Sequence, residues 1–107
     1  MVTVIERDEL PNGPLVRKGV PQGRHVHSVL AKGDQIMERL FPGLFSALLQ
    51  EGGELIDLAN DMCWHHFGVT KLKFASGVGM YTLSRPFLEW HVRKRLTDCP
   101  NVTLIDQ

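Results

Sequence analysis

The sequence predicts a mixed α/β fold with α+β character, in which a layer of parallel strands carries an inserted antiparallel β-meander. Two short β-branched runs, at residues 2–6 and 102–106, predict the strands of the layer. Apolar residues at helical spacing between these runs predict helices that would cover it. Residues 54–83 instead alternate between apolar and polar side chains and contain closely spaced turn residues, as antiparallel strands do.

The composition favours a small globular protein and argues against a nucleic-acid binder or a membrane-spanning chain. A chain of 107 residues, 43% hydrophobic and 22% charged, is typical of one small globular domain. Twelve basic and twelve acidic side chains balance, whereas a dedicated nucleic-acid binder carries a basic excess. The two cysteines lack CxxC spacing and are expected to be reduced thiols. We see no signal pattern and no apolar run near the roughly 18 residues of a membrane span, and expect a cytoplasmic protein.

The first half of the chain predicts one strand and two helices. After the strand at 2–6, residues 8–24 form a connection rich in proline and glycine, and loops of that length in a compact domain are usually functional or disordered. A helix is expected over 26–40, where Phe41-Pro42-Gly43 breaks it. A second helix is expected over 43–51, ended by the following glycine pair.

The second half predicts the meander, a third helix and a last strand. The expected meander strands are 54–58, 62–67, 70–75 and 79–83. Ser84 suits a helix N-cap and the nearby proline suits a first turn. The helix should turn an apolar face made of Leu88, Val92 and Leu96 to the core, and Glu89 and Arg93 should pair on its outside.

The first and last strands are expected to lie side by side as parallel neighbours. In this arrangement residues 2–53 and 84–106 form the layer, and residues 54–83 are inserted into it as the meander. The whole of 1–107 is then one domain or part of one.

The acidic residue that ends the first strand is a candidate for ligand binding. Glu6 directly follows a β-branched run. In dinucleotide-binding βαβ units an acidic side chain at the end of the second strand accepts hydrogen bonds from a ribose.

Three ordered motifs indicate a family. They are VTVIERD at residues 2–8, RKGVPQGRHVH at 17–27, and SRPFLEWHVRKR at 84–95 with Pro-Asn-Val after it. Together they resemble the FAD-dependent oxidoreductases of the aromatic-hydroxylase type, which include flavin monooxygenases and are related to geranylgeranyl reductases and squalene epoxidases. The resemblance implies a partial Rossmann-like FAD-binding layer, FAD as cofactor and NAD(P)H as electron donor. It also implies monooxygenation of an apolar or aromatic small molecule.

The same resemblance implies which residues meet the cofactor. Glu6 would bind the adenosine ribose, and Arg17 or Arg24 would approach the pyrophosphate or the ribityl chain. Gln22 and His25 would reach the region of the flavin ring. Arg85, in an R-x-x-L motif, would reach back toward the FAD. No residue is assigned as catalytic acid or base.

The sequence also departs from the family pattern. It has no G-x-G-x-x-G; Gly77-Val78-Gly79 lacks the third glycine and the strand-to-helix context. The later Gly-Asp segment that contacts the ribityl chain in the family is absent as well. We therefore expect an internal piece of such an enzyme, about one quarter of its length, that alone binds FAD weakly or not at all and is inactive.

Two other functions remain open at this point. A Cys/His metal-binding module is conceivable because the histidines cluster with a cysteine: His25, His27, Cys63, His65 and His66. A small non-catalytic interaction protein is the other alternative, since unpaired strand edges would favour a homodimer or a strand swap.

Overall fold

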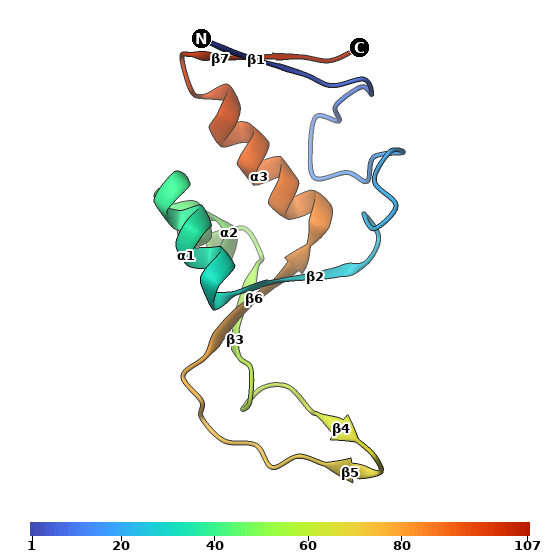
Figure 1. The fold of residues 1–107 in the computed structure, drawn as a ribbon, viewed down its shortest axis with the longest axis vertical. Coiled ribbons are helices and arrows are strands. Elements are labelled where there is room, and N and C mark those ends of the chain that lie inside the picture. Colours follow the sequence, from blue (N-terminus) through green and yellow to red (C-terminus); the bar gives the residue numbers. More distant parts are fainter. The chain divides into compact units, whose positions relative to one another are not determined.

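The computed structural model describes all residues from 1 to 107. Its helices are α1 (Ala31–Leu40), α2 (Leu44–Gln50) and α3 (Arg85–Thr97) (Figure 1). Its strands are β1 (Val2–Ile5), β2 (Val26–Leu30), β3 (Glu54–Asp57), β4 (His65–His66), β5 (Val69–Thr70), β6 (Gly79–Ser84) and β7 (Val102–Ile105). The fold is therefore mixed α and β, as predicted. No helix has the length and apolar character needed to cross a bilayer.

The strands form three small sheets. β1 pairs with β7, β6 lies between β2 and β3, and β4 pairs with β5. Contacts divide the chain into two compact units, Met1–His27 with Leu83–Gln107 (unit 1) and Ser28–Thr82 (unit 2). The predicted layer included residues 28–53, whereas these residues group with 54–82 in the structure.

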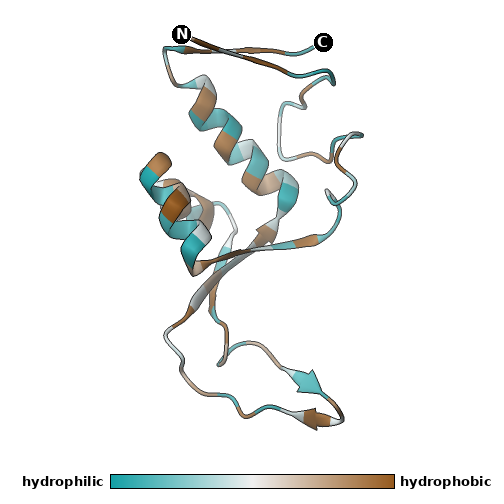
Figure 2. Cartoon of the chain, viewed as in Figure 1, coloured by the Kyte–Doolittle hydropathy of each residue, from teal (hydrophilic) through white to brown (hydrophobic).

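Unit 1 contains the parallel pair of strands. Val2 lies opposite Val102 and Ile5 opposite Ile105, which confirms that the first and last strands are parallel neighbours. The ladder continues one residue further, because the amide of Glu6 donates to the carbonyl of Ile105 at 2.8 Å. A β-branched run such as β1 suggests a buried strand, but its residues are exposed, Ile5 by 79%. Figure 2 shows the apolar character of both strands.

Unit 2 contains the larger apolar core. Its buried side chains come from β2, α2 and β6: Val29, Leu44, Phe45, Leu48 and Met80. α1 and α2 pack on each other, and α2 packs on β3. β3 and β6 are antiparallel, with Leu55 opposite Tyr81.

A long hairpin extends from β3 and β6, and we call residues 58–78 the arm. β4 and β5 lie at its far end (Figure 1). All side chains from 65 to 75 are exposed. The predicted meander was wrong in its pairing, because β3 pairs with β6 and neither β3 with β4 nor β5 with β6. The predicted strands 62–67 and 70–75 were also too long, since β4 and β5 have two residues each and Lys71–Val78 has no regular secondary structure. The alternation of apolar and polar residues from 65 to 75 does not mark a buried face, because all of these side chains are exposed.

The predicted helix over 26–40 was wrong in its first five residues. Val26–Leu30 is a strand, and the helix begins at Ala31 with no side-chain cap at Leu30. β-Branched Val26 and Val29 favour a strand where a neighbour can pair, and β6 is that neighbour. The other helices are close to the expected ranges, and the Oγ of Ser84 caps α3 by accepting from the amide of Phe87.

Candidate functional site

The carboxylate of Glu6 is held in place by two donors. Its Oε1 accepts from the amide of Asp8 at 3.1 Å, and its Oε2 accepts from Nη1 of Arg17 at 2.8 Å. These contacts, first the amide of Asp8 and then the guanidinium of Arg17, keep the pKa of Glu6 below its ordinary value. Glu6 is therefore an anionic acceptor at the carboxyl end of β1.

Arg17 joins the loop after β1 to α3. Its side chain is only 16% exposed, and its Nε lies 2.7 Å from Oε1 of Glu89. The Nε–H is not aligned for a hydrogen bond there, so this contact is an ion pair without that bond. Burial disfavours the charged form of Arg17, but the carboxylates of Glu6 and Glu89 outweigh it and raise the pKa.

Glu89 and Arg93 complete an ion-pair cluster with Glu6 and Arg17. Nη1 of Arg93 lies 3.9 Å from Oε1 of Glu89, which confirms the predicted pairing on α3. The pair was expected on the outside of the helix, but the Arg93 side chain is only 12% exposed. Arg93 also donates to the carbonyl of Pro11. The sequence did not predict the contact of Arg17 with Glu89, because it joins residues far apart in the chain.

A second carboxylate, that of Asp106, lies just beyond the end of β7. It accepts from the amide of Leu10 at 2.7 Å. Both strands of the parallel pair are thus followed by an acidic side chain, but Asp106 is used to hold the loop backbone. Sequence reasoning did not single out Asp106, although its position after a β-branched run is the same as that of Glu6.

A polar hollow of about 450 Å³ lies in the loop beside the cluster. Its lining residues are Val16, Arg17, Lys18, Val20, Pro21 and Arg24. Buried Gly23 lets the loop close tightly, since a Cβ at this position would meet Cγ1 of Val16 at 3.0 Å. Three cationic side chains around one hollow are suited to a phosphate group.

The remaining predicted site residues do not line this hollow. Gln22 and His25 are exposed, and the contact between them is a backbone turn in which the amide of His25 donates to the carbonyl of Gln22. Nη1 of exposed Arg85 lies 3.4 Å from Nε2 of His27. The structure thus pairs Glu6 with Arg17, and Arg17 shares the hollow with Arg24, whereas Gln22, His25 and Arg85 are not among its lining residues.

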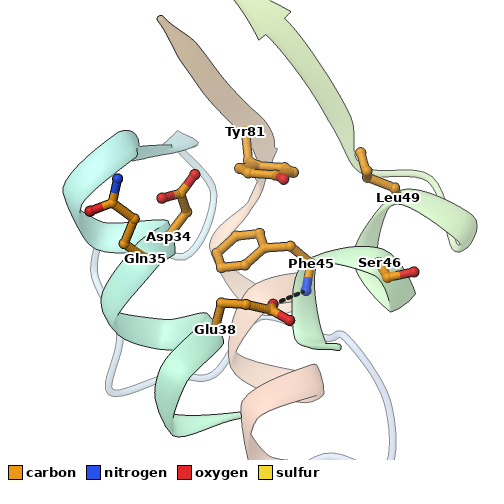
Figure 3. A pocket seen from close by; sticks show the side chains of 7 residues that line it. All are labelled: Asp34, Gln35, Glu38, Phe45, Ser46, Leu49 and Tyr81. Atoms are coloured by element: carbon orange, nitrogen blue, oxygen red, sulfur yellow. Dashed lines mark hydrogen bonds between the residues drawn. The ribbon is translucent and has the colours of Figure 1, made fainter. Parts of the chain in front are cut away.

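A second hollow, of about 460 Å³, lies in unit 2 between α1, α2 and β6 (Figure 3). The rings of Phe45 and Tyr81 are 4.3 Å apart at its centre, with Asp34 and Glu38 on the α1 side. Burial, followed by the charges of the two carboxylates, raises the pKa of Tyr81, so its phenol stays neutral. Carboxylates beside aromatic faces suit a small organic cation. Sequence reasoning missed this hollow; the i, i+4 spacing of the two carboxylates was the available signal.

The predicted alternative of a Cys/His metal module finds no support in the geometry. No group of three or more His, Cys, Asp or Glu side chains is placed to hold a metal ion. Cys63 is an exposed free thiol, and Nδ1 of His65 lies 3.2 Å from the hydroxyl of Thr70 across the hairpin.

Comparison with known proteins finds a relative that aligns with nearly the whole chain. The chain is 38% identical over 109 residues to Protein Rv3254 of Mycobacterium tuberculosis (strain ATCC 25618 / H37Rv). The match covers 97% of this chain but 23% of that protein, so the chain spans about a quarter of its relative's length. No protein-family model matches the chain.

Proposed function

We propose that this chain supplies part of the nucleotide-binding face of an FAD-dependent oxidoreductase. The supporting observation is the position of Glu6, at the carboxyl end of a parallel strand and 2.8 Å from Arg17, which lines a cationic hollow. An acceptor for ribose hydroxyls beside donors for phosphate is the arrangement that a dinucleotide requires.

The cationic residues of the site differ in whether a carboxylate of the protein neutralises them. Glu6 and Glu89 balance Arg17 and Arg93, so this cluster has no net charge to offer an anion. Lys18 and Arg24 line the same hollow and supply the positive charge that attracts phosphate. Arg17 is then a positioning residue. The oxygens of Glu6 retain lone pairs for a ribose diol, because each carboxylate oxygen accepts more than one hydrogen bond.

These residues fit the ribose and phosphate portions of FAD. When bound, the flavin supplies the redox chemistry, and the protein binds and orients it. By resemblance, we propose NAD(P)H as electron donor and monooxygenation of an apolar or aromatic substrate as the reaction. The chain lacks a G-x-G-x-x-G turn, which would hold the pyrophosphate at a helix N-terminus, so we expect weak binding and no activity from the chain alone.

An NMR titration of the ¹⁵N-labelled chain tests this proposal. FAD should shift the amide signals of residues 6–8 and 17–24, whereas riboflavin, which lacks the adenosine diphosphate portion, should not. Arg24→Gln should weaken FAD binding by about tenfold, because it removes a charged hydrogen-bond donor. Lys32→Ala, on α1, is the matched control and should leave binding unchanged. Equal shifts with riboflavin, or shifts confined to other segments, would refute the proposal.

A non-catalytic interaction protein is the second candidate. The observation in its favour is that β1 and β7 form a sheet of only two strands, with exposed apolar side chains at Val2, Ile5 and Ile105. Unpaired edges of this kind promote pairing between chains. Sedimentation velocity would test it: a monomer at all concentrations would count against this candidate and leave the nucleotide proposal unaffected.

A further inference from the structure

Phe67, at the tip of the arm, occupies a backbone position that disfavours its side chain. His66 in β4 pairs with Val69 in β5, which leaves Phe67 and Gly68 as a two-residue loop. Their φ angles are 51° and 81°, the pattern of a type I′ turn, and Phe67 is the one residue other than glycine with positive φ. Asn-Gly is the preferred pair in such turns, so a phenylalanine here is a cost to the fold. Backbone strain of this kind is typical of functional positions.

The ring of Phe67 is also fully exposed, and it is not alone. Leu72 is exposed by 91%, Val69 by 64% and Phe74 by 63%. Phe67 lies in the turn and Val69 in β5, and Leu72 and Phe74 lie on the segment that follows β5; none of the four belongs to the core of unit 2. Phe67 and Val69 therefore present apolar side chains to water at the end of the arm, and Leu72 and Phe74 line a hollow with Trp64 closer to its start.

The charges on this part of the arm are all of one sign. No aspartate or glutamate occurs between residues 62 and 75, whereas Lys71 and Lys73 flank Leu72. Nζ of Lys71 lies 5.7 Å from the centre of the Trp64 ring, so an aromatic side chain and a cation share one surface. Because the whole chain is neutral, this positive charge is a local feature of the arm.

We propose that the end of the arm docks on an anionic lipid bilayer, with the ring of Phe67 entering the interface. An apolar apex suits the boundary between headgroups and acyl chains. Lysines beside it can place their stems along the apolar layer and their ammonium groups at anionic headgroups. Trp64 is an amphipathic side chain of the type that is enriched at the interface between membrane and water. The docking surface lies in unit 2, and the inference does not depend on the nucleotide proposal.

Vesicle binding by the full chain tests this inference. Trp90→Phe leaves Trp64 as the only tryptophan, so its emission reports on the arm. With vesicles of equimolar phosphatidylcholine and phosphatidylglycerol, we expect cosedimentation and a blue shift of the Trp64 emission. With vesicles of phosphatidylcholine alone, both signals should be weaker.

Phe67→Asn separates docking from folding. Asparagine suits the positive φ, so the hairpin should be retained or stabilised while the apolar apex is lost, and vesicle binding should fall by about tenfold. Lys71→Gln with Lys73→Gln should also weaken binding by about tenfold or more, since each lysine charge near an anionic surface contributes about a fivefold factor. Leu40→Ser and Lys32→Gln, an exposed apolar and an exposed basic position on α1, are the matched controls.

Three results would overturn the inference. One is the absence of binding to anionic vesicles at low salt. Another is binding that Phe67→Asn leaves unchanged while circular dichroism shows a folded chain. The third is capture of a single-stranded oligonucleotide that depends on Phe67 and the lysines, without any binding to vesicles.

Discussion

Arg17 connects the end of β1 to α3 within unit 1. It contacts Glu6 after β1 and Glu89 on α3, and its side chain lies largely out of water. Sequence reasoning selected Glu6 and Arg17 separately, each from its own motif. It could not predict that Glu89 shares Arg17, because only the folded loop brings α3 to this position.

The first prediction concerns this shared cation. Arg17→Met should destabilise unit 1 by about 2 kcal/mol, because it leaves two half-buried carboxylates without their common partner. Arg17→Lys should restore part of the loss, since it keeps the charge but not the two-sided reach of the guanidinium. Urea unfolding followed by the fluorescence of Trp90 measures both changes. A stability equal to that of the unaltered chain would show that the ion pairs contribute nothing.

Asp57 closes the base of the arm. Its Oδ1 accepts from the amide of Ala59 and the hydroxyl of Ser76, and its Oδ2 accepts from the amides of Ser76 and Gly77. The hydroxyl of Ser76 contributes most to keeping the pKa of Asp57 well below its ordinary value, and the backbone donors add to it. One side chain thus connects the start of the arm to its end.

The second prediction follows from that lowered pKa. A carboxyl group whose pKa is lower in the folded state contributes stability above its unfolded pKa, near 3.9, and loses it as the pH falls toward the folded value. Asp57→Asn should therefore lower the Tm of unit 2 at pH 7, and the difference from the unaltered chain should shrink below about pH 4. Thermal unfolding followed by Trp64 fluorescence from pH 7 to pH 2 measures this. A difference that stays constant with pH would contradict the assignment. Asp98→Asn, on an exposed residue, serves as the control.

At the scale of elements, α2 depends on a cap from the helix before it. The carboxylate of Glu38 in α1 accepts from the amides of Gly43 and Phe45, which the helix itself leaves without partners. Figure 3 shows the bond to Phe45. Gly43 permits the tight link because its φ of 78° is in the left-handed region.

The third prediction tests this cap. Glu38→Ala should destabilise unit 2 by about 1 kcal/mol, although alanine is the better residue for the interior of α1. Lys32→Ala, an exposed change in the same helix, should be neutral or slightly stabilising. Circular dichroism during urea unfolding measures both variants. Equal behaviour of the two would mean that Glu38 adds no cap.

Sequence patterns predicted the elements that local propensity decides. β1 and β7 follow from β-branched runs, and α3 follows from Ser84, Pro86 and apolar spacing. β2 was missed because Val26–Leu30 fits a helical pattern equally well, and only pairing with β6 decides the outcome. The hollow beside α1 and α2 could not be predicted, since it depends on how Tyr81 stacks on Phe45.

At the scale of the whole molecule, the chain divides into two units that are stabilised by different interactions. Unit 2 has an apolar core from β2, α2 and β6, whereas unit 1 relies on ion pairs, the β1–β7 ladder and the half-buried side chains of α3. A unit with few fully buried apolar side chains is expected to be the less stable one.

The fourth prediction is that the two units unfold separately. Trp90→Phe leaves Trp64 to report on unit 2, and Trp64→Phe leaves Trp90 to report on unit 1. The Trp90 signal should change at lower urea concentration than the Trp64 signal, and added salt should widen the gap by screening the ion pairs of unit 1. Coincident transitions at every salt concentration would show a single cooperative molecule.

The closure at Asp57 has a practical consequence for protein engineering. Because one carboxylate sets the spacing between the two ends of the arm, residues beyond it can change without disturbing the junction with β3 and β6. A foreign peptide grafted between His66 and Val69 would be displayed on a stem of defined geometry, as insertions at exposed loop tips usually are. The chain thus offers a compact carrier for presenting short epitopes.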